Sequence, residues 1–149
     1  MRRKTLQDFA NVLCQRFIDL PNGDDLASLA HLGSGTYDLD ILNGGCTREG
    51  VPIPSLKMCD EYREWLSEQE GKRGIPPGIL RVNIRIRVSI SDQRVKTSYG
   101  HVFPSAHFDF DCRSEIQTDE KTYSGHKQGS KTWGLPASRN EQDQETQRH

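Results

Sequence analysis

Apolar side chains are scarce in this 149-residue chain, and they are unevenly distributed. Leu, Ile, Val and Phe make up 32 residues, about 21%, which is close to the level at which chains become disordered. Residues 114–149 contain only Ile116 and Leu135 from this group. Two such side chains cannot offset the conformational entropy lost when about 36 residues become ordered. We therefore predict one folded domain over residues 1–113 and a mostly disordered polar tail over residues 114–149.

Long apolar runs are also absent. The basic start Met-Arg-Arg-Lys is not followed by an apolar run of signal-peptide length, because Gln7, Asp8 and Asn11 interrupt it. No other segment approaches the length needed to cross a membrane. We predict a cytoplasmic protein with no membrane partner.

The chain has no C-x-x-C pair. Its four cysteines are Cys14, Cys46, Cys59 and Cys112, and their spacing matches no zinc motif. They lie on helical or strand patterns among small apolar neighbours. We predict buried free thiols, which are typical of a reducing compartment.

Neither sign of charge is in excess. Residues 1–113 contain 15 Lys or Arg and 15 Asp or Glu, and the whole chain has a formal net charge of −1. This balance argues against a protein that binds polyanions over its whole surface, but it leaves a local basic patch possible.

Periodic apolar residues predict helices and strands in separate parts of the chain. Three-to-four-residue periods predict helices over Thr5–Leu20, with Thr5 as its cap, over Asp25–Leu32 and over Ser55–Glu70. Two-residue alternation predicts strands over Tyr37–Ile41, Ile79–Ile90, Val95–Phe103 and His107–Cys112, with turns at Asp92-Gln93 and Pro104–Ala106. The predicted fold class is α+β, with the N-terminal helices packed on one face of a three- to four-stranded antiparallel β-meander.

The segment HFDFDC, residues 107–112, alternates strictly between polar and apolar side chains. A four-residue loop before it would put Phe108 and Phe110 in the core and leave Asp109 and Asp111 outside as partners of basic residues. A three-residue loop would instead bring His101, His107 and both aspartates together as a divalent metal site. Burying two Phe side chains is worth roughly 3–6 kcal/mol, which favours the first register.

Basic residues mark two candidate binding regions. Arg81, Arg85 and Arg87 share one strand face and, with Lys96, would form a basic ladder suited to phosphate oxygens, unless acids on neighbouring strands balance it. In the tail, Trp133 lies among lysines in KTYSGHKQGSKTWGLP, a pattern that suits stacking on single-stranded bases or anchoring in a protein groove.

The stretch GSGTYDLDIL resembles the signature of polymerase-β-type nucleotidyltransferases, in which two aspartates hold divalent metal. Asp38 and Asp40 would be those aspartates here, and Asp109 or Asp111 could supply the third carboxylate. In that family a longer segment separates the Gly-Ser from the first aspartate, whereas here only residues 35–37 do. We therefore assign the chain to no family.

These patterns support two hypotheses about function. The first is a non-enzymatic binding module, without cofactor, that contacts a protein or nucleic acid through Arg81, Arg85, Arg87 and Lys96, through Trp133 in the tail, or through both. The alternative is a metal-dependent enzyme acting on phosphodiesters or nucleotides, using Asp38, Asp40, Asp109, Asp111 and His107. The modest core also allows a homo-oligomer, in which a second copy completes the apolar face.

Overall fold

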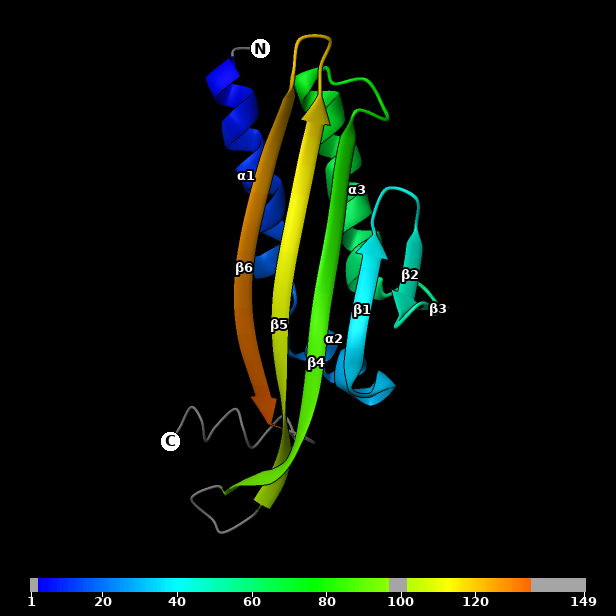
Figure 1. The fold of residues 1–149 in the computed structure, drawn as a ribbon, viewed down its shortest axis with the longest axis vertical. Coiled ribbons are helices and arrows are strands. Elements are labelled where there is room, and N and C mark those ends of the chain that lie inside the picture. Colours follow the sequence, from blue (N-terminus) through cyan, green and yellow to red (C-terminus); the bar gives the residue numbers. More distant parts are fainter. Residues whose placement is uncertain (1–2, 97–101, 135–149) are drawn as a thin grey trace.

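The computed structural model describes residues 3–96 and 102–134, which form three helices and one six-stranded sheet (Figure 1). In chain order the elements are α1 Arg3–Asp19, α2 Gly23–Leu32, β1 Gly35–Asp40, β2 Gly45–Arg48, β3 Val51–Pro52, α3 Lys57–Arg73, β4 Leu80–Lys96, β5 Val102–Gln117 and β6 Thr122–Gly134. The strands lie in the order β3-β2-β1-β4-β5-β6, and each neighbouring pair is antiparallel. The α+β class is confirmed, but the predicted three or four strands were too few.

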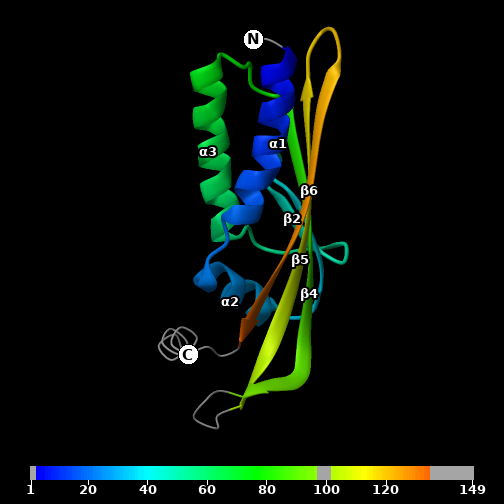
Figure 2. The same ribbon diagram turned by 90° about the vertical axis from the view of Figure 1, so that its left-hand side faces the viewer.

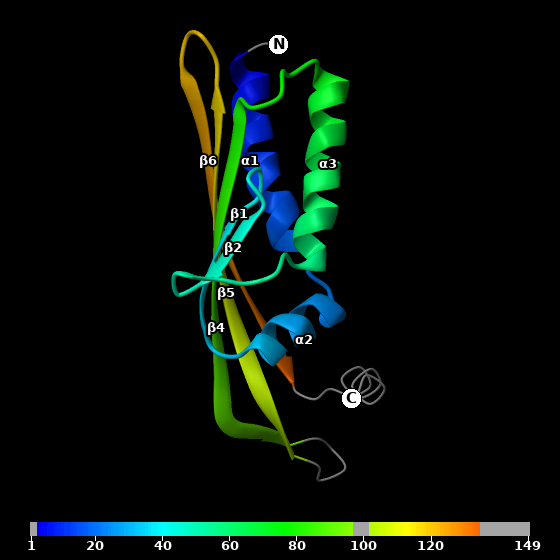
Figure 3. The same ribbon diagram turned by 90° about the vertical axis from the view of Figure 1, so that its right-hand side faces the viewer.

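The helices lie in one layer on one face of the sheet, and the other face carries no described helix (Figures 2 and 3). The core fills the space between the two layers. On β4 every second residue from Leu80 to Val88 is buried, while the residues between them are exposed. This is the alternation expected of a sheet with one covered face.

The helix boundaries differ from the predicted ones by a few residues. Helix α1 begins before Thr5, so that residue is not its cap. Asn22 caps α2 in a capping box with Asp25, each side chain accepting from the other's backbone N–H. Helix α3 continues through Gly71 and ends at Arg73, and Gly74 caps it in the left-handed conformation that favours glycine.

The predicted hairpin at Asp92-Gln93 was wrong. Strand β4 continues through these residues to Lys96, with a shift of register between Ser91 and Arg94. The predicted turn at Pro104–Ala106 was also wrong, because these residues belong to β5. Polar residues in an otherwise alternating strand look like a turn, but here they lie on an irregularity of the ladder. His101, which the alternative metal site required, lies outside the described residues.

The ordered sheet extends past residue 113, which corrects the predicted start of the disordered tail. Strand β5 ends at Gln117, and β6 adds a further edge strand up to Gly134. Residues 135–149 lie outside the described residues. Among the described helices, none combines the length and apolar character required to cross a membrane.

Candidate functional site

The uncovered face of the sheet is lined by polar and charged side chains from β1, β4, β5 and β6, and we call it the outer face. Its charged residues are Asp38, Asp40, Arg81, Arg85, Arg87, Asp109, Asp111, Arg113 and Glu115. The register alternates their signs across the strands. Asp38 lies opposite Arg85, which lies opposite Asp111, and Arg87 lies opposite Asp109. Each arginine of this central part is therefore next to a carboxylate.

The segment HFDFDC is a half-buried strand, as its alternation predicted, but no loop precedes it because residues 104–107 already belong to β5. Phe108, Phe110 and Cys112 are at most 1% exposed and face the helices. Strand β5 pairs with β4 on one side and with β6 on the other, so its aspartates have neighbours on both strands. The aspartates balance the arginines of β4, in keeping with the predicted charge-balancing role.

Three side-chain contacts join β5 and β6 on the outer face, and a histidine–aspartate contact within β5 adjoins them. Asp109 accepts a hydrogen bond from the Ser130 hydroxyl at 2.8 Å and contacts the His107 Nε2 atom at 3.1 Å. His107 Nδ1 lies 3.2 Å from the Thr132 hydroxyl, and His126 Nε2 lies 2.6 Å from an Asp111 oxygen. These contacts hold the edge strand in register on the polar side of the sheet.

The chain of contacts from Thr132 through His107 to Asp109 has the residue types of a nucleophile, a base and an orienting acid. Such a chain activates the hydroxyl where all three side chains are held in a fixed geometry in a site that excludes water. Here the His107 and Asp109 side chains are 48% and 44% exposed on an open strand surface. The geometry therefore supports a structural contact better than nucleophilic catalysis.

The contacts around Asp109 predict a pH-dependent contribution to stability. The hydrogen bond from Ser130, aided by His107 and Arg87, holds the pKa of this carboxyl below its ordinary value of 3.8. The ionised form is therefore favoured by folding, so the contribution is complete above that value and is lost as pH falls through the folded pKa. Because the side chain is 44% exposed, we expect it to be below about 1 kcal/mol.

The measurement compares urea unfolding of wild type and Asp109→Asn at pH 6 and at pH 3. The difference in unfolding free energy should be largest at pH 6 and should shrink at pH 3, and Ser130→Ala should reproduce most of it. A difference that is constant with pH would show that ionised Asp109 gains nothing from these neighbours.

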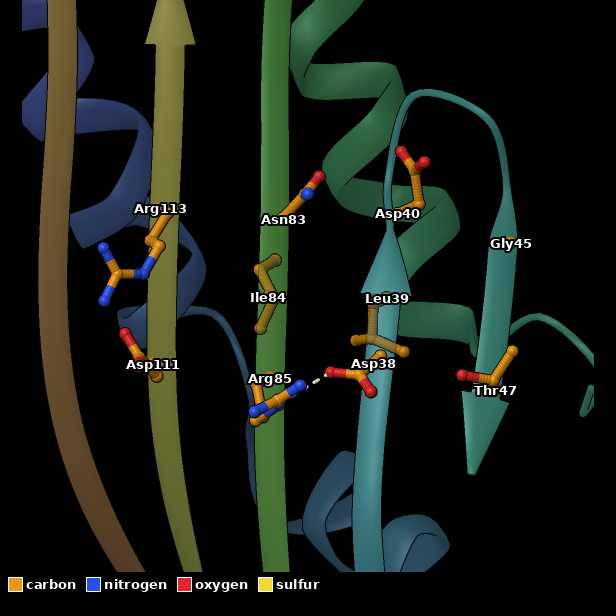
Figure 4. Close-up of a pocket in the computed structure, with 10 residues that line it drawn as sticks. All are labelled: Asp38, Leu39, Asp40, Gly45, Thr47, Asn83, Ile84, Arg85, Asp111 and Arg113. Carbon is orange, nitrogen blue, oxygen red and sulfur yellow. Dashed lines mark hydrogen bonds and ion pairs between the residues drawn. The ribbon is translucent and has the colours of Figure 1, made fainter. Parts of the chain in front are cut away.

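Arg85 lies at the centre of the outer face. Its Nε atom donates to Asp38 at 2.8 Å, and both side chains line a hollow of about 530 Å³ between β2 and β5 (Figure 4). A second hollow, of about 490 Å³, lies on the β6 side of Arg85 and is lined by Arg87, Asp109 and Ser130 among others. Within the described residues, Arg81 and Arg87 form no ion pair within 4 Å. Arg113 is also exposed on this face and has no ion pair among the described residues, so three guanidinium groups of the outer face are available to a partner.

The carboxylates of the enzyme hypothesis each contact different residues. Asp38 pairs with Arg85, Asp111 with His126, and Asp109 with Ser130 and His107. Asp40 accepts hydrogen bonds from the backbone and side chain of Asn43. Over residues 3–96 and 102–134, no three His, Cys, Asp or Glu side chains are grouped so that they could hold a metal ion. The expected convergence of these side chains on a metal site is therefore not found in the described chain.

The two remaining predicted binding residues are Trp133 and Lys96. Trp133 lies in β6 and packs against Gly23 at the start of α2, so it is partly buried on the helical side rather than presented by a tail. Lys96 is the last residue of β4, and its side chain lies outside the described part of the structure.

Sequence reasoning missed His126, which had no recognisable constellation around it. Its partner Asp111 is 15 positions away, and they meet only because β5 and β6 form a hairpin with Asp111 opposite Gln128. The aspartate alternation was visible in the sequence, but β6 was not predicted as a strand.

No family model, curated protein or solved structure matches this chain significantly.

Proposed function

We propose that the protein is a non-enzymatic interaction module that binds a protein partner on the outer face of its sheet. The observation that supports this most strongly is the uncovered face itself. Strands of 17 and 16 residues present a broad polar surface there, and every described helix lies on the opposite side (Figures 2 and 3). An interaction surface requires exposed side chains in a fixed geometry, and a sheet backed by a core provides such a support.

The charge pattern favours a protein over a nucleic acid. The charged residues of the outer face comprise four arginines and five acids, so neither sign dominates. Binding of a phosphate backbone requires a net basic surface, and binding of single strands also uses exposed aromatic rings. The aromatic residues of β4 and β5 whose exposure is described, Phe108 and Phe110, are buried. Alternating charges instead suit a partner with a complementary alternating pattern, because they penalise wrong registers.

Arg81 and Arg87 would provide the main contacts. Both side chains are exposed and have no described ion pair to give up on binding, whereas Arg85 would have to exchange Asp38 for a partner group. Arginine is enriched at interfaces because its planar fork can form two hydrogen bonds to one carboxylate. The carboxylates of the outer face would in turn favour basic groups on the partner protein. The proposal includes a cytoplasmic location. It also includes a second copy of the chain as one kind of protein partner.

The test is comparative capture from an extract of cells that express the protein, with chemical crosslinking and quantitative mass spectrometry. Arg81→Ala/Arg87→Ala should reduce recovery of a specific partner by at least tenfold while leaving the melting temperature within a few degrees. The matched control is Lys57→Ala/Lys72→Ala, which removes two exposed positive charges from α3 on the opposite side of the molecule and should retain the partner.

Equal recovery with both double variants would contradict the proposal for the outer face. A partner that is lost after nuclease treatment would show that nucleic acid, rather than protein, is bound. Crosslinks between copies in the purified protein would identify the partner as a second copy.

A further inference from the structure

Cys14 on α1 and Cys112 on β5 meet in the core, although 98 positions separate them in the chain. The Cys14 Sγ atom donates to the backbone oxygen of Cys112 at 3.3 Å. Both residues are fully buried, and both are free thiols. The proposed interaction at the outer face uses neither residue.

The backbones of α1 and β5 approach closely beside this pair. One helical turn before Cys14, the backbone oxygen of Ala10 accepts a hydrogen bond from Ser114 Oγ at 2.6 Å. Four residues of helix and two residues of strand both advance the chain by about 6 Å, so the contact at Ala10 and Ser114 repeats at Cys14 and Cys112. Ala10, Ser114 and the neighbouring Gly125 are all small, which is why the two layers come so close. A close approach of this kind suits the short Cα separation that a disulfide requires.

We propose that Cys14 and Cys112 form an intramolecular disulfide when the protein meets a small-molecule disulfide oxidant such as oxidised glutathione. The Cys14 thiolate attacks one sulfur of the oxidant and releases one thiol, and Cys112 then displaces the second. Two protein thiols are oxidised to one disulfide and the oxidant is reduced to two thiols, which receive the two protons. The resulting bond joins the helical layer to the sheet.

The two thiols are unequal in a way that suits this order of steps. A hydrogen bond from the Cys112 thiol lowers the pKa of Cys14, and hydrogen bonds from Ser114 and Lys127 act in the same direction. The same hydrogen bond between the two thiols, together with burial, raises the pKa of Cys112. Since the thiolate is the attacking form, Cys14 is the first nucleophile and Cys112 the resolving thiol. Because both are buried, the reaction proceeds when α1 opens transiently from the sheet.

The experiment uses the full chain with Cys46→Ser/Cys59→Ser, which leaves Cys14 and Cys112 as the only thiols. Folded protein is incubated with oxidised glutathione, and its mass, its peptide map and its melting temperature are then measured. We expect a mass loss of ~2 Da without a glutathione adduct and a cross-linked peptide pair that contains both cysteines. We also expect a melting temperature higher by roughly 10 °C that returns to its starting value with reductant, because the bond closes a loop of almost the whole domain.

Adding Cys14→Ser or Cys112→Ser to this variant should abolish both the mass loss and the thermal shift. A stable glutathione adduct, an unchanged mass, or a bond that forms only in denaturant would each overturn the proposal. The unfolded chain in denaturant serves as the positive control for the oxidant.

Discussion

Gly125→Ala is expected to destabilise the protein by about 3 kcal/mol or more, although it adds one methyl group to an edge strand. A Cβ atom at this position would lie 2.3 Å from the backbone oxygen of Ala10 and 2.7 Å from Ser114 Oγ. The obstacle is the backbone of α1, which cannot rotate away as a side chain would. The helix must therefore lift from β6 and lose its contacts with the sheet. Thermal or urea unfolding would measure the loss, which corresponds to a melting temperature lower by roughly 10 °C in a chain of this size.

Gly71→Ala is the matched control for this substitution. Gly71 lies within α3, is exposed, and has no atom within 4 Å of a Cβ added there. Alanine is favoured over glycine in an exposed helix by about 1 kcal/mol, so this variant should melt at a higher temperature than wild type. If Gly125→Ala unfolded at the same temperature as wild type, α1 would not be seated on β6 as described.

The same glycines explain why β6 could not be predicted from the sequence. A strand that supports a core normally shows alternating apolar side chains, and residues 114–134 have few of them. On the helical side of β6 the positions of Gly125 and Gly129 are filled by α1, whose Ala10 and Ile18 contact the strand directly. Gln7 also donates from α1 to the backbone oxygen of Ser124 at 2.7 Å. The apolar material that stabilises this strand comes from a distant helix, so a local count of apolar residues indicated disorder.

The part of the fold that depends on local alternation was predictable. Leu80 to Val88 and Phe108 to Cys112 bury the residues that their patterns indicated, and β1 buries Tyr37 and Leu39 as expected. The lengths and pairing of the long strands were not predictable, because Asp92 and Gln93 look like a turn but lie within β4. A pairing error of this kind changes every neighbour across the sheet while leaving the two faces unchanged.

The candidate site follows the same division. That Arg85, Arg87, Asp109 and Asp111 would lie on the polar face was readable from two-residue alternation. Which arginine lies next to which aspartate depended on the register, and the register depended on residues far apart in the chain. The contacts of His126 and Ser130 with the aspartates could not be predicted without β6. That Asp38 pairs with Arg85 rather than joining a metal site could not be predicted without the pairing of β1 with β4.

Phe110→Ala is expected to cost about 3–5 kcal/mol, the range typical of a buried Phe truncated in a core. The side chain is 1% exposed and lies between the buried Ile86 of β4 and the glycine of β6 that contacts Ile18 of α1. Removing this side chain leaves a cavity at the centre of the sheet. Helix α1 cannot move in to fill it, because its backbone already contacts β6. Urea unfolding of the purified variant would measure the change.

Asp111→Ala, one position further along the same strand, tests the opposite face. It removes the contact with His126 and leaves Arg85 with Asp38, both on an exposed surface where a single ion pair contributes at most about 1 kcal/mol. The two variants should therefore differ severalfold in stability, because one strand separates a core from a polar surface. If Asp111→Ala cost as much as Phe110→Ala, the outer face would be part of the structural core, and its arginines and aspartates could not be regarded as a surface held ready for a partner.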